Sequence, residues 1–296
     1  MHSRNRFTES DFSENLAQLK TIGIQSLFLT PYTFQKHIYS DSIFTTKETI
    51  TDEDLISAIQ LAKSSGFSVS LKPHVDCLDG EPRFRIEPVN IPTWFKHYRE
   101  LMVKYAKISE QQQLSLLVIG TELDNIAENP LFISMIDTLR TVFSGKLTYA
   151  SSYNHFLELR IWSKLDYIGV NCWLNLDNGS ASDEQIFQSW NYWLNLLEQF
   201  SIYQKKPVLI TETGFRSMDG TAQNPGDWSY TGQINLQLQA CCYESLLSQV
   251  SSFPKINGVF WWQWELGNVG GPLNGDYTPH GKPAEEVIKK YWVNYE

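Results

Sequence analysis

The stretch that decides the fold is Pro207-Val208-Leu209-Ile210-Thr211-Glu212-Thr213-Gly214-Phe215. Its apolar run predicts a strand that is buried on both faces, and this strand ends in a carboxylate. Because alternate side chains of a strand share a face, Val208, Ile210 and Glu212 are expected to point the same way. Burial of an unpartnered charge on a core face is costly, so Glu212 is a candidate functional residue.

A second stretch has the same design: Leu116-Leu117-Val118-Ile119-Gly120-Thr121-Glu122. Here Val118, Gly120 and Glu122 are predicted to share a face. Each glutamate taken singly is also compatible with a buried structural ion pair. Two buried strands that both end in an inward glutamate favour function, since a pair of carboxyl groups is what glycoside hydrolysis requires.

The composition excludes several classes of protein. Of the 296 residues 42% are hydrophobic, which is enough for a large core, and no apolar run is long enough to span a membrane. The net charge of −9 argues against nucleic-acid binding. No apolar stretch follows the basic residues at 1–6, so we expect a cytoplasmic protein as the sequence stands. Secretion stays an alternative if the N-terminus is incomplete.

The four cysteines form no CxxC pair and have no metal-ligand spacing. We therefore expect buried free thiols, which favours a reducing compartment.

Strands and helices alternate along the chain without a linker, so we expect one α/β domain over residues 1–296. Strands are predicted to begin near residues 26, 68, 115, 147, 167, 208 and 258. Because several strands end in polar residues, a (β/α)8 TIM barrel is favoured. An open doubly wound sheet is the alternative, but no glycine-rich phosphate loop follows any strand.

Seven strands are predicted, one fewer than a (β/α)8 barrel needs, because the first predicted element of the chain is a helix rather than a strand. Thr8 and Asp11 are predicted to cap this helix. Residues 2–7 are too few and too polar to form a strand. We therefore expect the first barrel strand to be missing, with a seam between residues 26–30 and 258–264 through which copies of the chain associate.

Four motifs together resemble glycoside hydrolase family 113, a clan A family of retaining β-mannanases. They are Lys72-Pro73 after the second predicted strand of this chain, Gly120-Thr121-Glu122, Thr211-Glu212-Thr213-Gly214 and the Trp-rich strand at 258–264. The resemblance covers nearly the whole chain. It implies that Glu122 is the acid/base and Glu212 the nucleophile. It implies no metal or organic cofactor, and an oligo- or polysaccharide as substrate.

The resemblance also suggests substrate-binding residues. Trp262, at the end of the last strand, would form the floor of the sugar subsite next to the cleaved bond, and it is predicted to share a face with Phe260 and Trp264. Asn154 and Asn171, after and within later strands, are lesser candidates. Trp190 and Trp193 have helical spacing and are predicted to be core residues.

Residues 72–76 give three further candidates. Lys72 either binds substrate or pairs with a carboxylate of the barrel, and His74 either binds a sugar hydroxyl on the rim of the site or is a satisfied loop histidine. His74 and Asp76 supply two metal ligands without a third, so we reject a metal site. A loop is predicted over residues 76–92.

The sequence departs from the clan pattern at two positions. Thr121 stands where many clan A enzymes have asparagine, which still fits the family that the chain resembles. Trp173 stands where such enzymes usually have a tyrosine that supports the nucleophile. An indole N–H donates one hydrogen bond and accepts none, so activity or specificity is expected to differ.

Three alternatives to a mannan hydrolase remain. The first is another clan A glycanase, such as a β-glucanase. The second is a catalytically silent carbohydrate-binding barrel, which the late start and Trp173 make conceivable. The third, an aldolase-type barrel, would use Lys72 as its inward lysine, and the paired carboxylates do not call for it.

Overall fold

The computed structural model describes residues 10–177, 182–229, 231–267 and 269–293. These residues form two compact units. Unit 1 contains residues 10–25 and the chain from residue 171 onward, and unit 2 contains residues 26–170. The single domain expected from the sequence stays a prediction.

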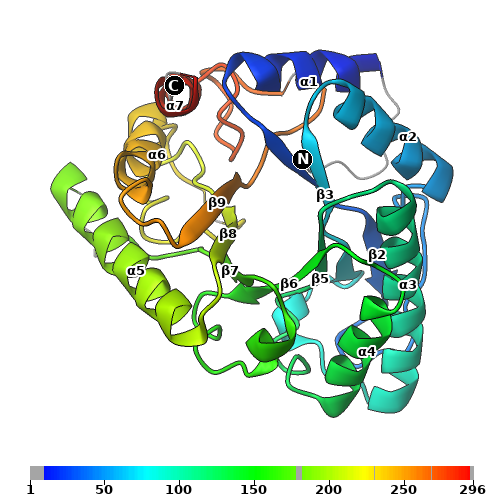
Figure 1. The fold of residues 1–296 in the computed structure, drawn as a ribbon. Helices are drawn as coiled ribbons and strands as arrows, with labels where there is room; N and C mark the ends of the chain where they lie inside the picture. Colours follow the sequence, from blue (N-terminus) through cyan, green and yellow to red (C-terminus); the bar gives the residue numbers. More distant parts are fainter. Residues whose placement is uncertain (1–9, 178–181, 230, 268, 294–296) are drawn as a thin grey trace. The chain divides into compact units, whose positions relative to one another are not determined.

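Unit 2 is a run of parallel strands connected by helices (Figure 1). β1 pairs with β3 from Ser26↔Ser68 to Leu29↔Leu71, β3 pairs with β5 at Leu71↔Leu117, and β5 pairs with β6. α3 and α4 lie side by side. The elements are β1 (Ser26–Leu29), α2 (Asp52–Ser64), β3 (Ser68–Leu71), α3 (Ile91–Gln111), β5 (Leu116–Thr121), α4 (Pro130–Arg140), β6 (Lys146–Ser152) and η2 (Ile161–Lys164).

Two short strands of unit 2 were not predicted. β2 (Tyr32–Gln35) and β4 (His74–Cys77) form a separate parallel pair just beyond the ends of β1 and β3. Pro73 has no N–H to donate, so the ladder is interrupted there and resumes at His74. The loop predicted over residues 76–92 is therefore corrected: it contains the end of β4, the turn η1 (Arg83–Arg85) and the start of α3.

Unit 1 is built on β8 (Val208–Thr213), which pairs in parallel with β9 (Ile256–Trp261). All six residues of β8 are buried, whereas none of β9 is. α5 and α6 lie outside these strands (Figure 1). The helices of the unit are α1 (Ser10–Thr21), α5 (Asp183–Gln204), α6 (Leu236–Val250) and α7 (Pro283–Trp292). The remaining strand, β7 (Ile168–Asn171), ends where the chain passes from unit 2 to unit 1.

The helix ends follow local chemistry. The Thr51 hydroxyl caps α2 by accepting from the N–H of Asp54. Gly23 and Gly66 have φ of +83° and +81° where α1 and α2 have ended. The capping role predicted for Thr8 falls outside the described residues.

All seven predicted strands occur among the described residues, which confirms the α/β class. The first barrel strand was expected to be missing from the sequence. The residues before α1, 1–9, lie outside the described residues, so this expectation stays a prediction. One prediction about the core was half wrong. Trp190 of α5 is fully buried, but Trp193 is only half-buried, and its ring packs edge-on against the exposed Tyr192.

Candidate functional site

Glu212 lies at the end of the most deeply buried strand of unit 1. It is 4% exposed, and Val208 and Ile210 are fully buried. The indole Nε1–H of Trp173 donates a hydrogen bond of 3.2 Å to Oε2 of Glu212. Trp173 thus contacts the carboxylate as a donor, through one of its two oxygens.

Two side-chain bonds attach β8 to the end of β7 and the residue after it. The Thr211 hydroxyl donates to Oδ1 of Asn171 (2.8 Å), and the Thr213 hydroxyl donates to the Cys172 carbonyl (3.1 Å). Asn171 is fully buried. The threonines on both sides of Glu212 thus restrict the strand that carries it.

Trp262 belongs to a group of four side chains that we call the aromatic cluster: Trp173, Trp228, Trp262 and Tyr277. Trp262 and Trp173 meet edge-on with ring centroids 6.5 Å apart. β9 ends at Trp261, so the face that Trp262 was predicted to share with Phe260 and Trp264 does not continue as regular strand. Trp264 is buried, and its indole donates to Asn15 of α1 (2.7 Å).

Glu122 directly follows β5 and has a left-handed backbone, with φ of +51°. The register between β5 and β6 shifts between Val118 and Thr121, so strand alternation does not set the direction of the Glu122 side chain as the sequence pattern implied. Its N–H donates to the Ala150 carbonyl of β6 (2.8 Å). A non-glycine residue held in this region carries strain, which is frequent at functional sites.

Arg83 of η1 joins two carboxylates of unit 2. Its Nε and Nη2 donate to Oδ1 of Asp76 at 3.1 and 2.5 Å. Its Nη1 lies 3.8 Å from Oε2 of Glu122. The three side chains are only 16–19% exposed. Sequence reasoning missed Arg83 because the loop around it has no periodicity.

Lys72 and His74 are each 1% exposed. The Lys72 ammonium lies 6.0 Å from the centre of the Phe28 ring, and the His74 ring packs edge-on against Tyr32 at 5.3 Å. The position predicted for His74 is corrected, because it lies buried in β4 rather than on a rim or in a loop. Asn154 is exposed in the turn that follows β6.

A further acidic side chain lies two residues beyond Glu122. Oδ2 of Asp124 accepts from the Ser152 hydroxyl (2.6 Å), and Oδ1 lies 3.7 Å from Nδ1 of His155. Burial raises the pKa of the Asp124 carboxyl, although Ser152 and His155 oppose the shift. Asp124 therefore has more tendency to hold a proton than an exposed aspartate.

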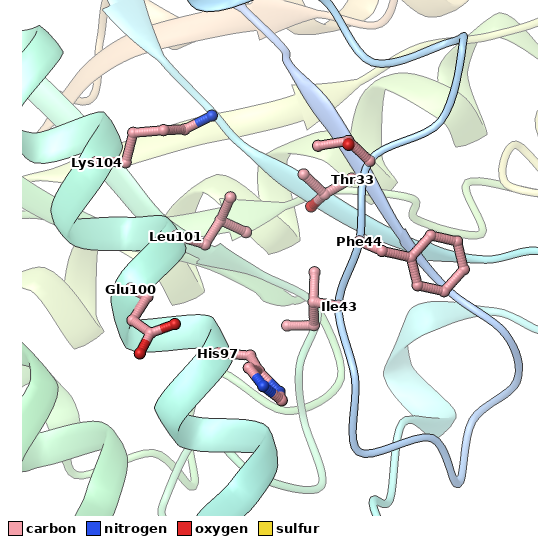
Figure 2. A pocket seen from close by; sticks show the side chains of 8 residues that line it. Thr33, Ile43, Phe44, His97, Glu100, Leu101 and Lys104 are labelled. Atoms are coloured by element: carbon pink, nitrogen blue, oxygen red, sulfur yellow. The ribbon is translucent and has the colours of Figure 1, made fainter.

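Unit 2 also has a cavity of about 250 Å³ between α3 and the segment around Ile43 (Figure 2). Ile43, His97 and Leu101 point into it, whereas the Phe44 ring points away from α3. The ammonium group of Lys104, which lines this cavity, is paired with Asp52, since its Nζ lies 2.8 Å from Oδ1 of Asp52. None of the predicted site residues lines this cavity. Its lining is Thr33, Ile43, Phe44, Thr45, His97, Glu100, Leu101 and Lys104.

Within the described ranges, no three His, Cys, Asp or Glu residues are grouped so that they could hold a metal ion. The four cysteines are free thiols. The expectation that all of them are buried is wrong for Cys241, which is half-buried. No helix in the part of the chain that the structure covers is long and apolar enough to cross a membrane.

Comparison with solved structures places the fold. A GH113 beta-1,4-mannanase in a complex structure superposes with a TM-score of 0.89 at 26% identity, covering 99% of this chain and 96% of that one. The GH113 beta-mannanase AaManA from Alicyclobacillus acidocaldarius, in complex with ManMIm, has a TM-score of 0.88 at 21% identity, covering 98% and 94%. A beta-D-glucuronidase from Dictyoglomus thermophilum shares the fold alone, with a TM-score of 0.64 at 15% identity over 97% of this chain and 47% of that one.

A search of curated protein sequences found no match. The model of Glycoside Hydrolase Family 113 matches residues 1–282. This match spans both glutamate-bearing strand ends and the aromatic cluster, and the TIM-barrel fold of the neighbours agrees with it. The chain is therefore a glycoside hydrolase with a TIM-barrel fold, and it belongs to Glycoside Hydrolase Family 113.

Proposed function

We propose that this enzyme cleaves β-1,4-linked mannose-containing glycans with retention of configuration. Glu122 acts as acid/base and Glu212 as nucleophile. The family match supports hydrolysis, and the structural neighbours described as beta-1,4-mannanases support the choice of mannan.

The proposed reaction has two displacements. Protonated Glu122 gives its proton to the glycosidic oxygen while the carboxylate of Glu212 attacks the anomeric carbon, so the leaving sugar departs as an alcohol. Glu122, now ionised, then takes a proton from water, and the oxygen of that water displaces Glu212. A retaining mechanism needs the two carboxyl groups about 5–5.5 Å apart, and this spacing is a requirement of the proposal.

The observation that carries the proposal is the hydrogen bond from Trp173 to Glu212. Glu212 is almost fully buried, so its orientation depends on its neighbours. The indole N–H of Trp173 restrains this orientation through Oε2, at 3.2 Å. The nucleophile of a double displacement needs a carboxylate that is positioned in this way.

The role assigned to Glu122 is supported by its setting. The left-handed backbone and the bond to Ala150 hold the residue at the end of β5, while Arg83 approaches one carboxylate oxygen. Arg83 makes its shorter contacts with Asp76, and the negative charge of Asp76 offsets part of the field of the guanidinium at Glu122.

The first test measures reducing-sugar release from linear β-1,4-mannan, β-glucan and xylan. The native chain is compared with Glu122→Gln and Glu212→Gln, and Glu100→Gln on the exposed face of α3 is the matched control. We expect cleavage of mannan, a loss of at least about 1000-fold in both site variants and native activity in the control. Preferential cleavage of glucan would establish the β-glucanase alternative instead, and a folded chain inert on all three would contradict hydrolysis of these substrates.

A second test separates the two roles. Azide is added to Glu122→Ala and Glu212→Ala with an aryl β-mannoside, whose aryloxide leaves without protonation. Azide is expected to rescue both variants, giving a β-mannosyl azide with Glu122→Ala and an α-mannosyl azide with Glu212→Ala. The opposite pairing would reverse the assignment.

A further inference from the structure

Trp228 is an exposed aromatic side chain on an anchored loop between β8 and α6. It is 54% exposed. The Tyr277 hydroxyl donates to the Pro225 carbonyl (2.5 Å), and the Leu176 N–H donates to the Ala222 carbonyl (2.8 Å). These bonds restrain the loop just before Trp228, so little conformational entropy would be lost when a ligand covers the indole.

The loop is also closed from its other side. The Asp219 N–H donates to the Gln233 carbonyl (2.9 Å), and the Asn235 N–H donates to the Ser217 carbonyl (2.9 Å). Trp228 therefore lies at the exposed tip of a loop whose two arms are bonded to each other and whose near arm is bonded to the unit beneath it.

The aromatic cluster closes into a ring of four contacts. Trp228 meets Trp262 edge-on, with centroids 6.2 Å apart and planes at 86°, and it meets Tyr277 at 4.7 Å and 49°. Trp173 completes the ring through edge-on contacts with Trp262 at 6.5 Å and with Tyr277 at 5.7 Å. Since Trp173 also donates to Glu212, a chain of direct contacts connects Trp228 with the proposed nucleophile.

We propose that Trp228 contacts the substrate and forms the side wall of the sugar subsite beside Glu212, with Trp262 as its floor. This inference rests on the proposed function. The nearly perpendicular rings of Trp228 and Trp262 make a corner rather than a flat platform. A pyranose can place one face on the floor and its edge against the wall. The C–H groups of the sugar carry positive partial charge and meet the negative faces of the rings, and burial of the exposed indole adds hydrophobic stabilisation.

The test compares kcat/KM on β-1,4-mannohexaose for the native chain, Trp228→Ala and Trp228→Phe. Tyr203→Ala is the control, because Tyr203 is 78% exposed on α5 and lies outside the aromatic cluster. We expect a fall of about 10- to 100-fold for the alanine variant, as for a central aromatic contact. The phenylalanine variant should retain most of the activity and the control all of it, with unchanged melting temperatures. Trp228→Gln replaces the alanine variant if that one does not fold.

Binding is measured separately by calorimetry with mannohexaose and cellohexaose in a Glu212→Gln background, so that the glycan survives. Adding Trp228→Ala to this background should raise the Kd of the glycan that binds more tightly by about tenfold or more. If the native chain cuts mannan while Trp228→Ala binds and cuts within twofold of its parent, the role proposed for Trp228 is overturned and the proposed function stands. If the chain binds glycan through Trp228 but cuts none, the proposed function is overturned and the role of Trp228 in binding stands. A chain that neither cuts nor binds would overturn both.

Discussion

Nη1 of Arg83 lies 3.8 Å from Oε2 of Glu122, while the same guanidinium holds Asp76 through Nε and Nη2. One arginine therefore links the residue proposed as acid/base to a second carboxylate, all within unit 2. The planar fork of arginine makes this arrangement directional, and lysine would not reproduce it.

Arg83→Met is expected to lower kcat/KM on mannohexaose by about 10- to 100-fold, because a misplaced catalytic group loses rate steeply. Arg83→Lys should recover only part of the loss. Arg85→Met is the matched control: Arg85 lies two residues away, is 53% exposed and pairs with Glu81. Equal effects of the Arg83 and Arg85 substitutions would argue against a positioning role.

Trp173→Phe keeps the ring but removes the N–H that holds Glu212. A hydrogen bond to a charged group contributes about 1.5–3 kcal/mol, so kcat is expected to fall by about 10- to 100-fold. Trp173→Tyr should lose less, because its hydroxyl can also donate. The melting temperature of each variant is measured beside kcat, and a Phe variant with native kcat would show that this hydrogen bond is dispensable.

Gly214 of the Thr-Glu-Thr-Gly motif has no room for a side chain. A Cβ there would lie 1.9 Å from the carbonyl oxygen of Trp262, which is backbone and cannot rotate away. Gly214→Ala is expected to destabilise the fold by about 2–4 kcal/mol in urea unfolding. Gly258→Ala serves as control, since its Cβ would meet Leu209 Cδ2 at an ordinary 3.4 Å. Comparable losses in both variants would contradict the steric account.

Lys282 gives a prediction about pH. It is 3% exposed, and its Nζ donates to Ser217, Asn274 and the Asp276 carbonyl at 2.8–2.9 Å. Burial lowers the pKa of Lys282 from 10.5 to about 8. Between these values the unfolded chain binds more protons than the folded one. The destabilising contribution of the charge is therefore fully present below pH 8 and is relieved as the pH rises to 10.5.

The measurement compares the native chain with Lys282→Met in urea unfolding at pH 7.5 and pH 10. The stability of the native chain relative to the variant should rise with pH, by at most about 3 kcal/mol. A difference that stays constant or falls with pH would show that the ammonium is not destabilised by burial.

The regular parts of the fold were predictable because they depend on local patterns. The apolar run at Val208–Thr213, the threonine cap at Thr51 and the helix-ending Gly23 each encode their structure within a few residues. The strand ends that carry Glu122 and Glu212 could be found in the same way.

The rest depends on contacts between distant residues or on exceptions to the strand rule. Arg83 meets Glu122 across 39 residues of sequence (122 − 83), and neither lies in a pattern that points to the other. Trp228 is a single tryptophan in an irregular loop, so nothing periodic indicates its partners. The left-handed backbone of Glu122 breaks the alternation on which its predicted direction rested.

Trp173 has a consequence for the behaviour of the enzyme in alkaline solution. A tyrosine in its place would lose its proton near pH 10 and would then repel the carboxylate that it supported. The indole N–H does not titrate in this range, so its bond to Glu212 remains as the solution becomes basic. The upper pH limit of catalysis is therefore set by groups other than the indole of Trp173 that holds Glu212.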